Sequence, residues 1–187
     1  PNLGPVFGEI ASETRRQGGY AFHAHGGYAQ EIWADLVQGA THGVELFQFG
    51  IYRGIGLEGW YHVLNCGFRF PGIGACDYPA CRKLGDSRTY VHIEGEPTFA
   101  AWLASAAEGR SFMSSGPLVL LEVDGHRPGD VITADRAKLK QVTARITVHS
   151  ETCPVTDVQL IVNGRVAYST QARPTPGEGQ KIEIEKT

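Results

Sequence analysis

Long hydrophobic runs and concentrated positive charge are both missing from this sequence. No apolar stretch approaches the roughly 18 residues that a membrane-spanning helix needs. The 17 lysines and arginines are spread thinly along 187 residues, and the formal net charge is -3, so no basic stripe can follow a phosphate backbone. We therefore expect neither a membrane nor a nucleic acid as a partner.

Cysteine is also scarce, with four residues at positions 66, 76, 81 and 153 and no CxxC pair. This spacing indicates neither a structural zinc knuckle nor a dense disulfide framework. Cys76 and Cys81 could form a disulfide, and buried or free thiols are the alternative that we favour. A basic segment followed by an apolar one is absent at the start, so we expect no secretory signal within this sequence, as in a mature or trimmed chain.

The first two thirds of the chain alternate short apolar runs with helical periodicity, which is typical of α/β units. Strands are expected at 19–25, 43–49, 68–78 and 87–94. Helices are expected from Ala29 to Val37 with Ile32, Trp33, Leu36 and Val37 on one face, around Leu57 to Leu64 with Gly67 as its cap, and from Pro97 with Gly109 as its cap.

From about Ser111 onward the helical period gives way to alternation. Residues 142–149 alternate apolar and polar side chains, which predicts a strand with one buried face. Asn163 and Gly164 separate two further strands, and this dipeptide is a strong hairpin signal. One short strand follows, which is few for a closed sandwich, so we expect an incomplete module. The predicted domains are an α/β unit at 1–117 and an antiparallel β-sandwich-like unit at 118–187.

Two histidines stand one residue apart in "GYAFHAHGG", at the end of the first predicted strand. Side chains at i and i+2 of a strand share a face, so His23 and His25 could approach one metal ion or one substrate from the same side. Neutral imidazole suits zinc, iron and similar ions, and the glycines that follow permit close approach. The alternative is one histidine facing solvent and the other hydrogen-bonded.

Two carboxylates are further candidates. Glu45 lies among apolar residues in "GVELFQF", and a buried carboxylate must be paired, hydrogen-bonded or metal-bound. An ion pair with Arg53 or Arg69 is the alternative explanation. Asp77 ends the strand in "GIGACDYP", where parallel α/β sheets present catalytic groups. The histidines at 42, 62, 92, 126 and 149 are weaker candidates, which we expect at the surface.

Four segments resemble, in order and at similar spacing, the later half of the carbaryl-hydrolase-like metallohydrolases, the CehA/McbA group of the PHP superfamily. They are "GGYAFHAHGG", "THGVELFQF", "WYHVLNCGFRFPGIGACDYP" and "GDSRTYVHIEGEPTFAAWLASAAEGRSFMSSGPLVLLEVDGHRPGD". The most distinctive parts are "LNCGFRFPGIGACD" and "GRSFMSSGPLVLLEVDGHRPGD", and the resemblance runs from about Gly18 to Asp130.

This resemblance implies a distorted β/α barrel of seven strands, with a divalent zinc, manganese or iron ion at the carboxyl ends of the strands, followed by a β-rich tail. In the family pattern His25 takes the ligand role with His23 as its neighbour, Glu45 matches a strand glutamate, and Asp77 matches the last metal-binding loop. The Asp-x-His ending of that loop is absent, and the opening His-x-His has no counterpart. We therefore expect a fragment of a longer enzyme. The alternatives are that another molecule supplies the missing half of the barrel, or that the metal site is degenerate.

The resemblance implies a metal-dependent hydrolase of a small-molecule ester, carbamate or amide; alternatives are a phosphoesterase of the same superfamily and a non-catalytic binding or structural module. Arg88 could contact an anionic substrate group, or it could pair with Asp86. Half a barrel leaves strand edges unpaired, which favours a homo-oligomer. The same resemblance favours a periplasmic or secreted location.

Overall fold

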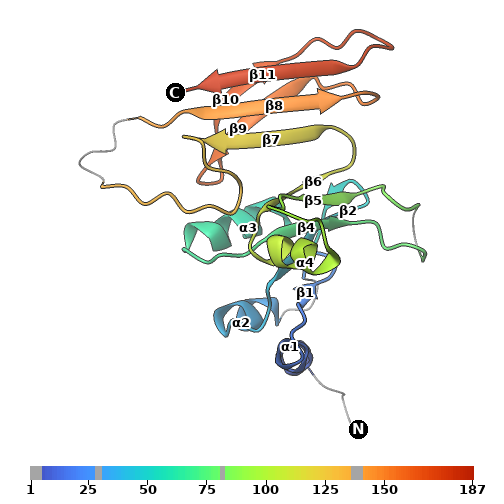
Figure 1. Cartoon of the computed structure of the whole chain (residues 1–187), viewed down its shortest axis with the longest axis vertical. Coiled ribbons are helices and arrows are strands. Elements are labelled where there is room, and N and C mark those ends of the chain that lie inside the picture. The colour runs from blue at the N-terminus through green and yellow to red at the C-terminus, as the bar shows by residue number, and fades with distance from the viewer. Residues whose placement is uncertain (1–5, 28–30, 81–82, 136–140) are drawn as a thin grey trace.

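The computed structural model describes residues 6–27, 31–80, 83–135 and 141–187 and has a mixed α/β fold dominated by strands (Figure 1). Its first part carries the helices and a small mixed sheet, and its last part consists of antiparallel strands. No closed barrel forms among the residues in those four ranges. No helix within them is long and apolar enough to cross a membrane.

The sheet of the first part is built around β2 (Gly43–Gln48), which has all six residues buried. Two strands pair with it in parallel, β1 (Phe22–His23) and β4 (Gly72–Ala75), while β3 (Ile51–Tyr52) folds back antiparallel on its end. A strand that is apolar on both faces needs cover on both sides, which explains why "GVELF" lies at the centre. The predicted strand at 43–49 is confirmed.

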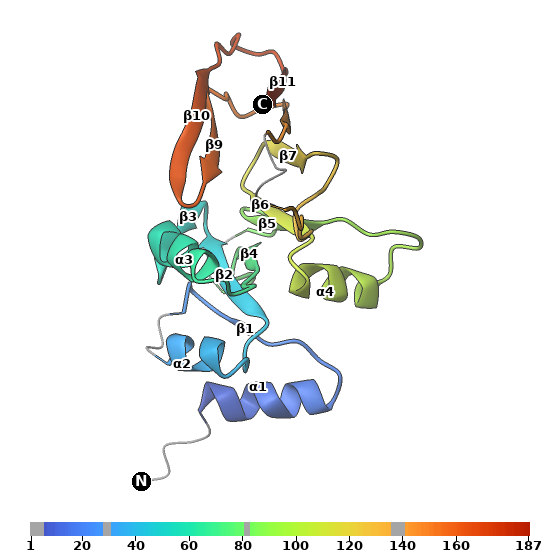
Figure 2. The ribbon, with the colours of Figure 1, turned by 90° about the vertical axis from the view of Figure 1, so that its left-hand side faces the viewer.

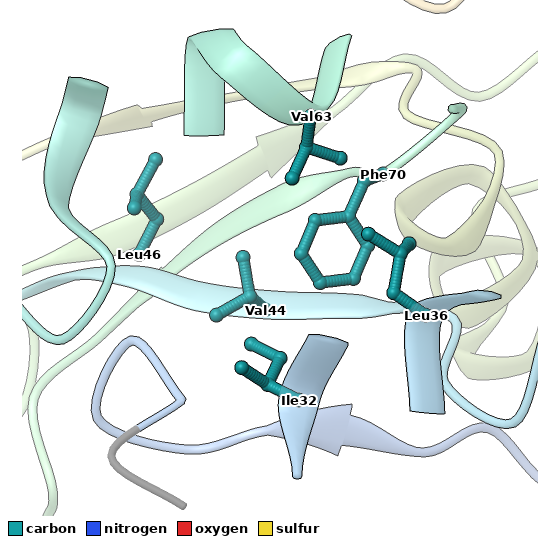
Figure 3. Packing of buried hydrophobic residues seen from close by; sticks show 6 residues of the cluster. All are labelled: Ile32, Leu36, Val44, Leu46, Val63 and Phe70. Carbon is teal, nitrogen blue, oxygen red and sulfur yellow. The ribbon is translucent and has the colours of Figure 1, made fainter. Parts of the chain in front are cut away.

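The described residues form four helices: α1 (Phe7–Arg16), α2 (Ile32–Val37), α3 (Gly56–Asn65) and α4 (Phe99–Ala107). The predicted helix α3 and its Gly67 cap are confirmed, since Gly67 has a φ of 87°. Trp60 anchors α3 because its Nε1 donates to the Phe70 carbonyl at 2.7 Å. Figure 3 shows six side chains from α2, β2, α3 and the segment before β4 that meet in one core: Ile32, Leu36, Val44, Leu46, Val63 and Phe70.

A hairpin continues the α/β part beside β4. Its strands are β5 (Arg88–Val91) and β6 (Ser111–Ser114), which pair antiparallel on either side of α4 in sequence. The Thr89 hydroxyl lies 2.8 Å from both the amide nitrogen and the carbonyl oxygen of Gly74, so it joins this hairpin to β4.

The last part is a two-layered antiparallel unit, seen edge-on in Figure 2. One layer contains β7 (Leu118–Val123), β8 (Ala144–Ser150) and β11 (Gln180–Lys186), and the other is the hairpin of β9 (Asp157–Val162) and β10 (Arg165–Gln171). Ile146 and Val148 of β8 pack against Val158 of β9 between the layers. Asn163 and Gly164 have φ of 52° and 77°, as the predicted hairpin turn requires.

Several predicted boundaries are wrong. The first strand contains only Phe22 and His23 of the predicted 19–25. Helix α4 begins at Phe99 rather than Pro97, because the Thr98 side chain accepts the Ala101 amide at 3.1 Å and serves as the N-cap. Residues 29–30 of the predicted helix from Ala29 to Val37 lie outside the described residues, and so does Cys81; the Cys76 thiol is free.

The predicted apolar face of α2 is only half correct. Ile32 and Leu36 are buried, whereas Trp33 and Val37 are 45% and 70% exposed. The helix has only six residues, so it turns a narrow face toward β2.

Candidate functional site

Three predicted site residues belong to three adjacent parallel strands. Glu45 lies in β2, His25 follows the end of β1, and Asp77 follows the end of β4. Parallel strands direct their carboxyl ends to one edge of a sheet, which is where open α/β sheets bind ligands. We call this the carboxyl edge. Strand direction, which the parallel pairing sets, therefore places His25 and Asp77 on opposite sides of β2 at one edge.

His23 and His25 do not share a strand face, so that prediction is wrong. Strand β1 ends at His23, and His25 has a φ of 56°, in the left-handed region, so the i, i+2 rule stops applying between them. His23 is 3% exposed and His25 is exposed. The two imidazoles therefore lie in different environments.

The His23 side chain is held inside the protein by a carboxylate and an aromatic ring. Its Nε2 lies 3.0 Å from Asp35 Oδ2, and the Phe7 ring of α1 stacks on the imidazole with centroids 3.7 Å apart. Burial lowers the pKa of His23 more than the nearby Asp35 raises it. The buried ring thus connects α1, β1 and α2, with Asp35 at one of its two nitrogens.

Glu45 meets the requirement that a buried carboxylate be hydrogen-bonded. It is 8% exposed, and its Oε2 accepts the backbone N–H of His25 at 2.7 Å and the Gln48 side-chain amide at 3.4 Å. The predicted alternative of an ion pair between Glu45 and Arg69 is wrong, because Arg69 Nη2 donates instead to the Gly129 carbonyl at 2.6 Å. The guanidinium of Arg53 lies 5.6 Å from the centroid of the Phe49 ring.

The segment after His25 touches the loop before α3 backbone to backbone. The Ile55 N–H donates to the Gly26 carbonyl at 2.8 Å. A Cβ added to Gly26 would lie 1.9 Å from the Arg53 carbonyl oxygen, and one added to Gly54 would lie 2.0 Å from the Gly26 oxygen. Only glycine permits two backbones to approach this closely. The first glycine of "HGG" therefore marks the point at the carboxyl edge where the segment after His25 crosses the loop before α3.

Asp77 ends the loop after β4 with a φ of 53° and is half-buried. Aspartate tolerates the left-handed region better than most residues. The Cys76 thiol before it is buried, and a cis peptide bond joins Tyr78 to Pro79 after it.

Two buried polar atoms near this edge have no hydrogen-bond partner among the described residues: Gln48 Oε1 and Arg88 Nε. Arg88 opens β5, and its guanidinium lies 5.7 Å from the centroid of the Tyr90 ring. The predicted alternative of an ion pair with Asp86 is wrong within the described part of the chain. Unsatisfied buried groups in a native fold call for a partner, such as a ligand or water.

Sequence reasoning missed Asp35 and Gln48. The signal for Gln48 was present, because it is a second polar residue inside the same apolar run as Glu45 and is 1% exposed. Asp35 gave no comparable signal, since an aspartate in a short helix usually faces water. The expectation of surface positions is confirmed for His62, His126 and His149, which are exposed.

Across the residues that the structure describes, no group of three His, Cys, Asp or Glu side chains is close enough to hold a metal ion. Zinc in a catalytic site takes three protein ligands. His25 and Asp77 would therefore need at least one ligand from beyond the described ranges.

This chain matches no protein-family model, no curated protein and no solved structure.

Proposed function

We propose that this chain is part of a metal-dependent hydrolase that resembles the carbaryl-hydrolase-like group of the PHP superfamily and cleaves an ester, carbamate or amide bond. The observation that carries the proposal is the buried Glu45 carboxylate, which binds the backbone N–H of His25 at 2.7 Å at the carboxyl edge. A carboxylate that fixes the turn bearing an exposed imidazole is what a pre-organised ligand requires.

In this proposal His25 and Asp77 are the metal ligands that the chain contributes. Zinc, manganese and iron accept imidazole nitrogen and carboxylate oxygen. When bound, such an ion lowers the pKa of a coordinated water toward neutrality and polarises the scissile carbonyl. His23 keeps a structural role through Asp35.

Glu45 and Arg88 act beside the metal in different ways. Glu45 is a positioning residue, because it holds the backbone of His25 rather than the substrate. Arg88 is the group for an anionic substrate, since its buried Nε lacks a partner within the described ranges. That free donor also favours a second candidate substrate class, a phosphoester, whose oxygens suit a guanidinium.

A non-catalytic module with a degenerate metal site is a candidate of another class. The burial of His23 against Asp35 and the absence of a third ligand from the described residues favour it.

In the hydrolase proposal, β1, β2 and β4 are successive strands of the later half of a PHP-type barrel. A second polypeptide, including another copy of this chain, then covers the unpaired sheet edge, and the location is periplasmic or secreted, as the resemblance suggests.

Metal content tests the proposal. The purified chain is incubated with zinc, manganese or iron, excess metal is removed, and elemental analysis is performed on wild type, His25→Ala and Asp77→Ala. His62→Ala and Asp86→Ala are matched controls, because both residues are exposed. We expect stoichiometric metal in wild type and controls and loss in both site variants. A wild-type chain without metal, or metal that is indifferent to both substitutions, would contradict the proposal and support the non-catalytic module.

A further inference from the structure

A cavity of about 440 Å³ lies between the β5–β6 hairpin and β7. Figure 1 shows how the chain passes from β6 directly into β7. Val91 and Ser111 line it, at the end of the hairpin opposite Arg88, so it is separate from the carboxyl edge. Val91, Phe112 and Leu120 supply apolar walls. A volume of this size suits a small organic molecule.

Strand β7 carries more apolar surface than the antiparallel unit covers. Leu121 pairs with Ile146 and faces the core between the layers. Leu120 therefore belongs to the opposite face, where its partner is the polar Thr147, and it is 49% exposed. Leu118 and Val119 are exposed as well, so β7 presents several apolar side chains beside the cavity, which suits an apolar occupant.

Positive groups stand at the mouth of this cavity. Arg127 Nη1 contacts His92 Nε2 at this mouth. Arg110 Nε binds Glu108 at 3.1 Å, and its Nη atoms have no acceptor among the described residues. Both arginine side chains are about half exposed, at 42% for Arg110 and 51% for Arg127.

Acidic groups limit how much negative charge this mouth can accept. Glu122 lines the cavity and lies 3.4 Å from Arg127 Nε. Asp130 Oδ2 accepts the backbone N–H of Arg127 at 2.9 Å and is within 3.7 Å of His126. Together with Glu108, which pairs with Arg110, these carboxylates offset the charges of both arginines, so the site binds an anion through guanidinium N–H donors, and a single negative charge fits better than a dianion.

We propose that this cavity binds a small amphipathic monoanion, with an aromatic or branched aliphatic body inside and a carboxylate or sulfonate at Arg110 and Arg127. The head group replaces His92 Nε2 as the partner of Arg127, because a carboxylate or sulfonate makes a charge-assisted hydrogen bond to a guanidinium. The body covers Leu120 and Phe112. The proposal is independent of the metal centre, since it uses neither His25 nor Asp77.

Two probes with one carbon skeleton test the proposal. 1-Anilinonaphthalene-8-sulfonate has the anionic group, and N-phenyl-1-naphthylamine lacks it. Fluorescence titrations compare wild type with the double variant Arg110→Met/Arg127→Met, which keeps much of the apolar length of both side chains. Arg165→Met is the control, because Arg165 is an exposed arginine of β10.

We expect the double variant to bind the sulfonate about tenfold or more weakly, as the loss of charge-assisted hydrogen bonds predicts, and the neutral probe within about twofold. Leu120→Glu should weaken both probes, and methyl NMR shifts on sulfonate binding should centre on Val91 and Leu120 in wild type. Equal sulfonate affinity in wild type and double variant, or shifts centred elsewhere, would overturn the proposal.

Discussion

The backbone N–H of His25 donates to Glu45 Oε2 at 2.7 Å, which joins the turn after β1 to the middle strand of the sheet. The acceptor is buried, and the donor belongs to a residue in the left-handed region. A charged acceptor makes this bond stronger than one between neutral groups.

Replacing Glu45 with alanine should release this turn. The His25 N–H and the Gln48 amide lose their acceptor, and an unsatisfied buried donor costs about 1–3 kcal/mol of stability. Amide exchange followed by NMR should show faster exchange at His25. Glu58→Ala, on the exposed side of α3, serves as the control and should leave that rate unchanged. Equal exchange in the Glu45 variant would mean that the bond does not hold the turn.

Gly26→Ala should destabilise the fold far more than Gly18→Ala. Both glycines have positive φ, 67° and 80°, so alanine is strained at each by about 1–2 kcal/mol. A Cβ at Gly26 also meets the Arg53 carbonyl oxygen at 1.9 Å, whereas Gly18 has open space. Urea denaturation should show a loss of more than about 3 kcal/mol for the first variant only. Similar losses in both would rule out the backbone crossing.

Stability should fall as the pH is lowered through the ordinary range of histidine. Burial holds the pKa of His23 below its usual value, so near pH 6.5 the unfolded chain takes up a proton that the folded chain does not. The free energy of unfolding therefore decreases from about pH 7.5 to pH 5. His42 contributes in the same direction, because burial and Arg15 lower its pKa.

Chemical denaturation across this pH range separates the two histidines. His23→Gln should make the slope shallower, and adding His42→Gln should flatten it further. A slope unchanged by His23→Gln would show that His23 is protonated in the folded protein, in contact with Asp35.

Leu46→Ala should create a cavity in the core of the α/β part. Leu46 is fully buried between α3 and β4, and such truncations cost about 2–5 kcal/mol. Leu84→Ala is a matched control at 78% exposure and should stay within about 0.5 kcal/mol of wild type. Thermal denaturation of the two variants checks the difference, and a small loss for Leu46→Ala would contradict this core.

Elements with a strong local signal were predictable from the sequence. The apolar run of β2, the helical spacing of α3 and the Asn163–Gly164 turn all depend on near neighbours in the chain. The short strand β1 was less predictable, because two residues form a strand only when a partner such as β2 is in place.

In the candidate site, too, the sequence predicted the features that depend on local residues and missed those that depend on packing. A buried glutamate in an apolar strand implies a hydrogen-bond partner, and Glu45 has one. Its partner, a backbone N–H 20 residues away, and the pairing of His23 with Asp35 depend on how β1, β2 and α2 pack. The predicted metal roles of His25 and Asp77 stay predictions.

By itself the sequence determined strand β2, helix α3 and the Asn163–Gly164 turn, through apolar periodicity and glycine positions, because these signals act between near neighbours in the chain. Only the tertiary structure decided that His23 is enclosed while His25 is exposed. Both histidines carry the same side chain, but burial against Phe7 and Asp35 is a property of the packed fold. The strand ends between them because His25 turns into the left-handed region and leaves the pairing, although β2 itself continues to Gln48.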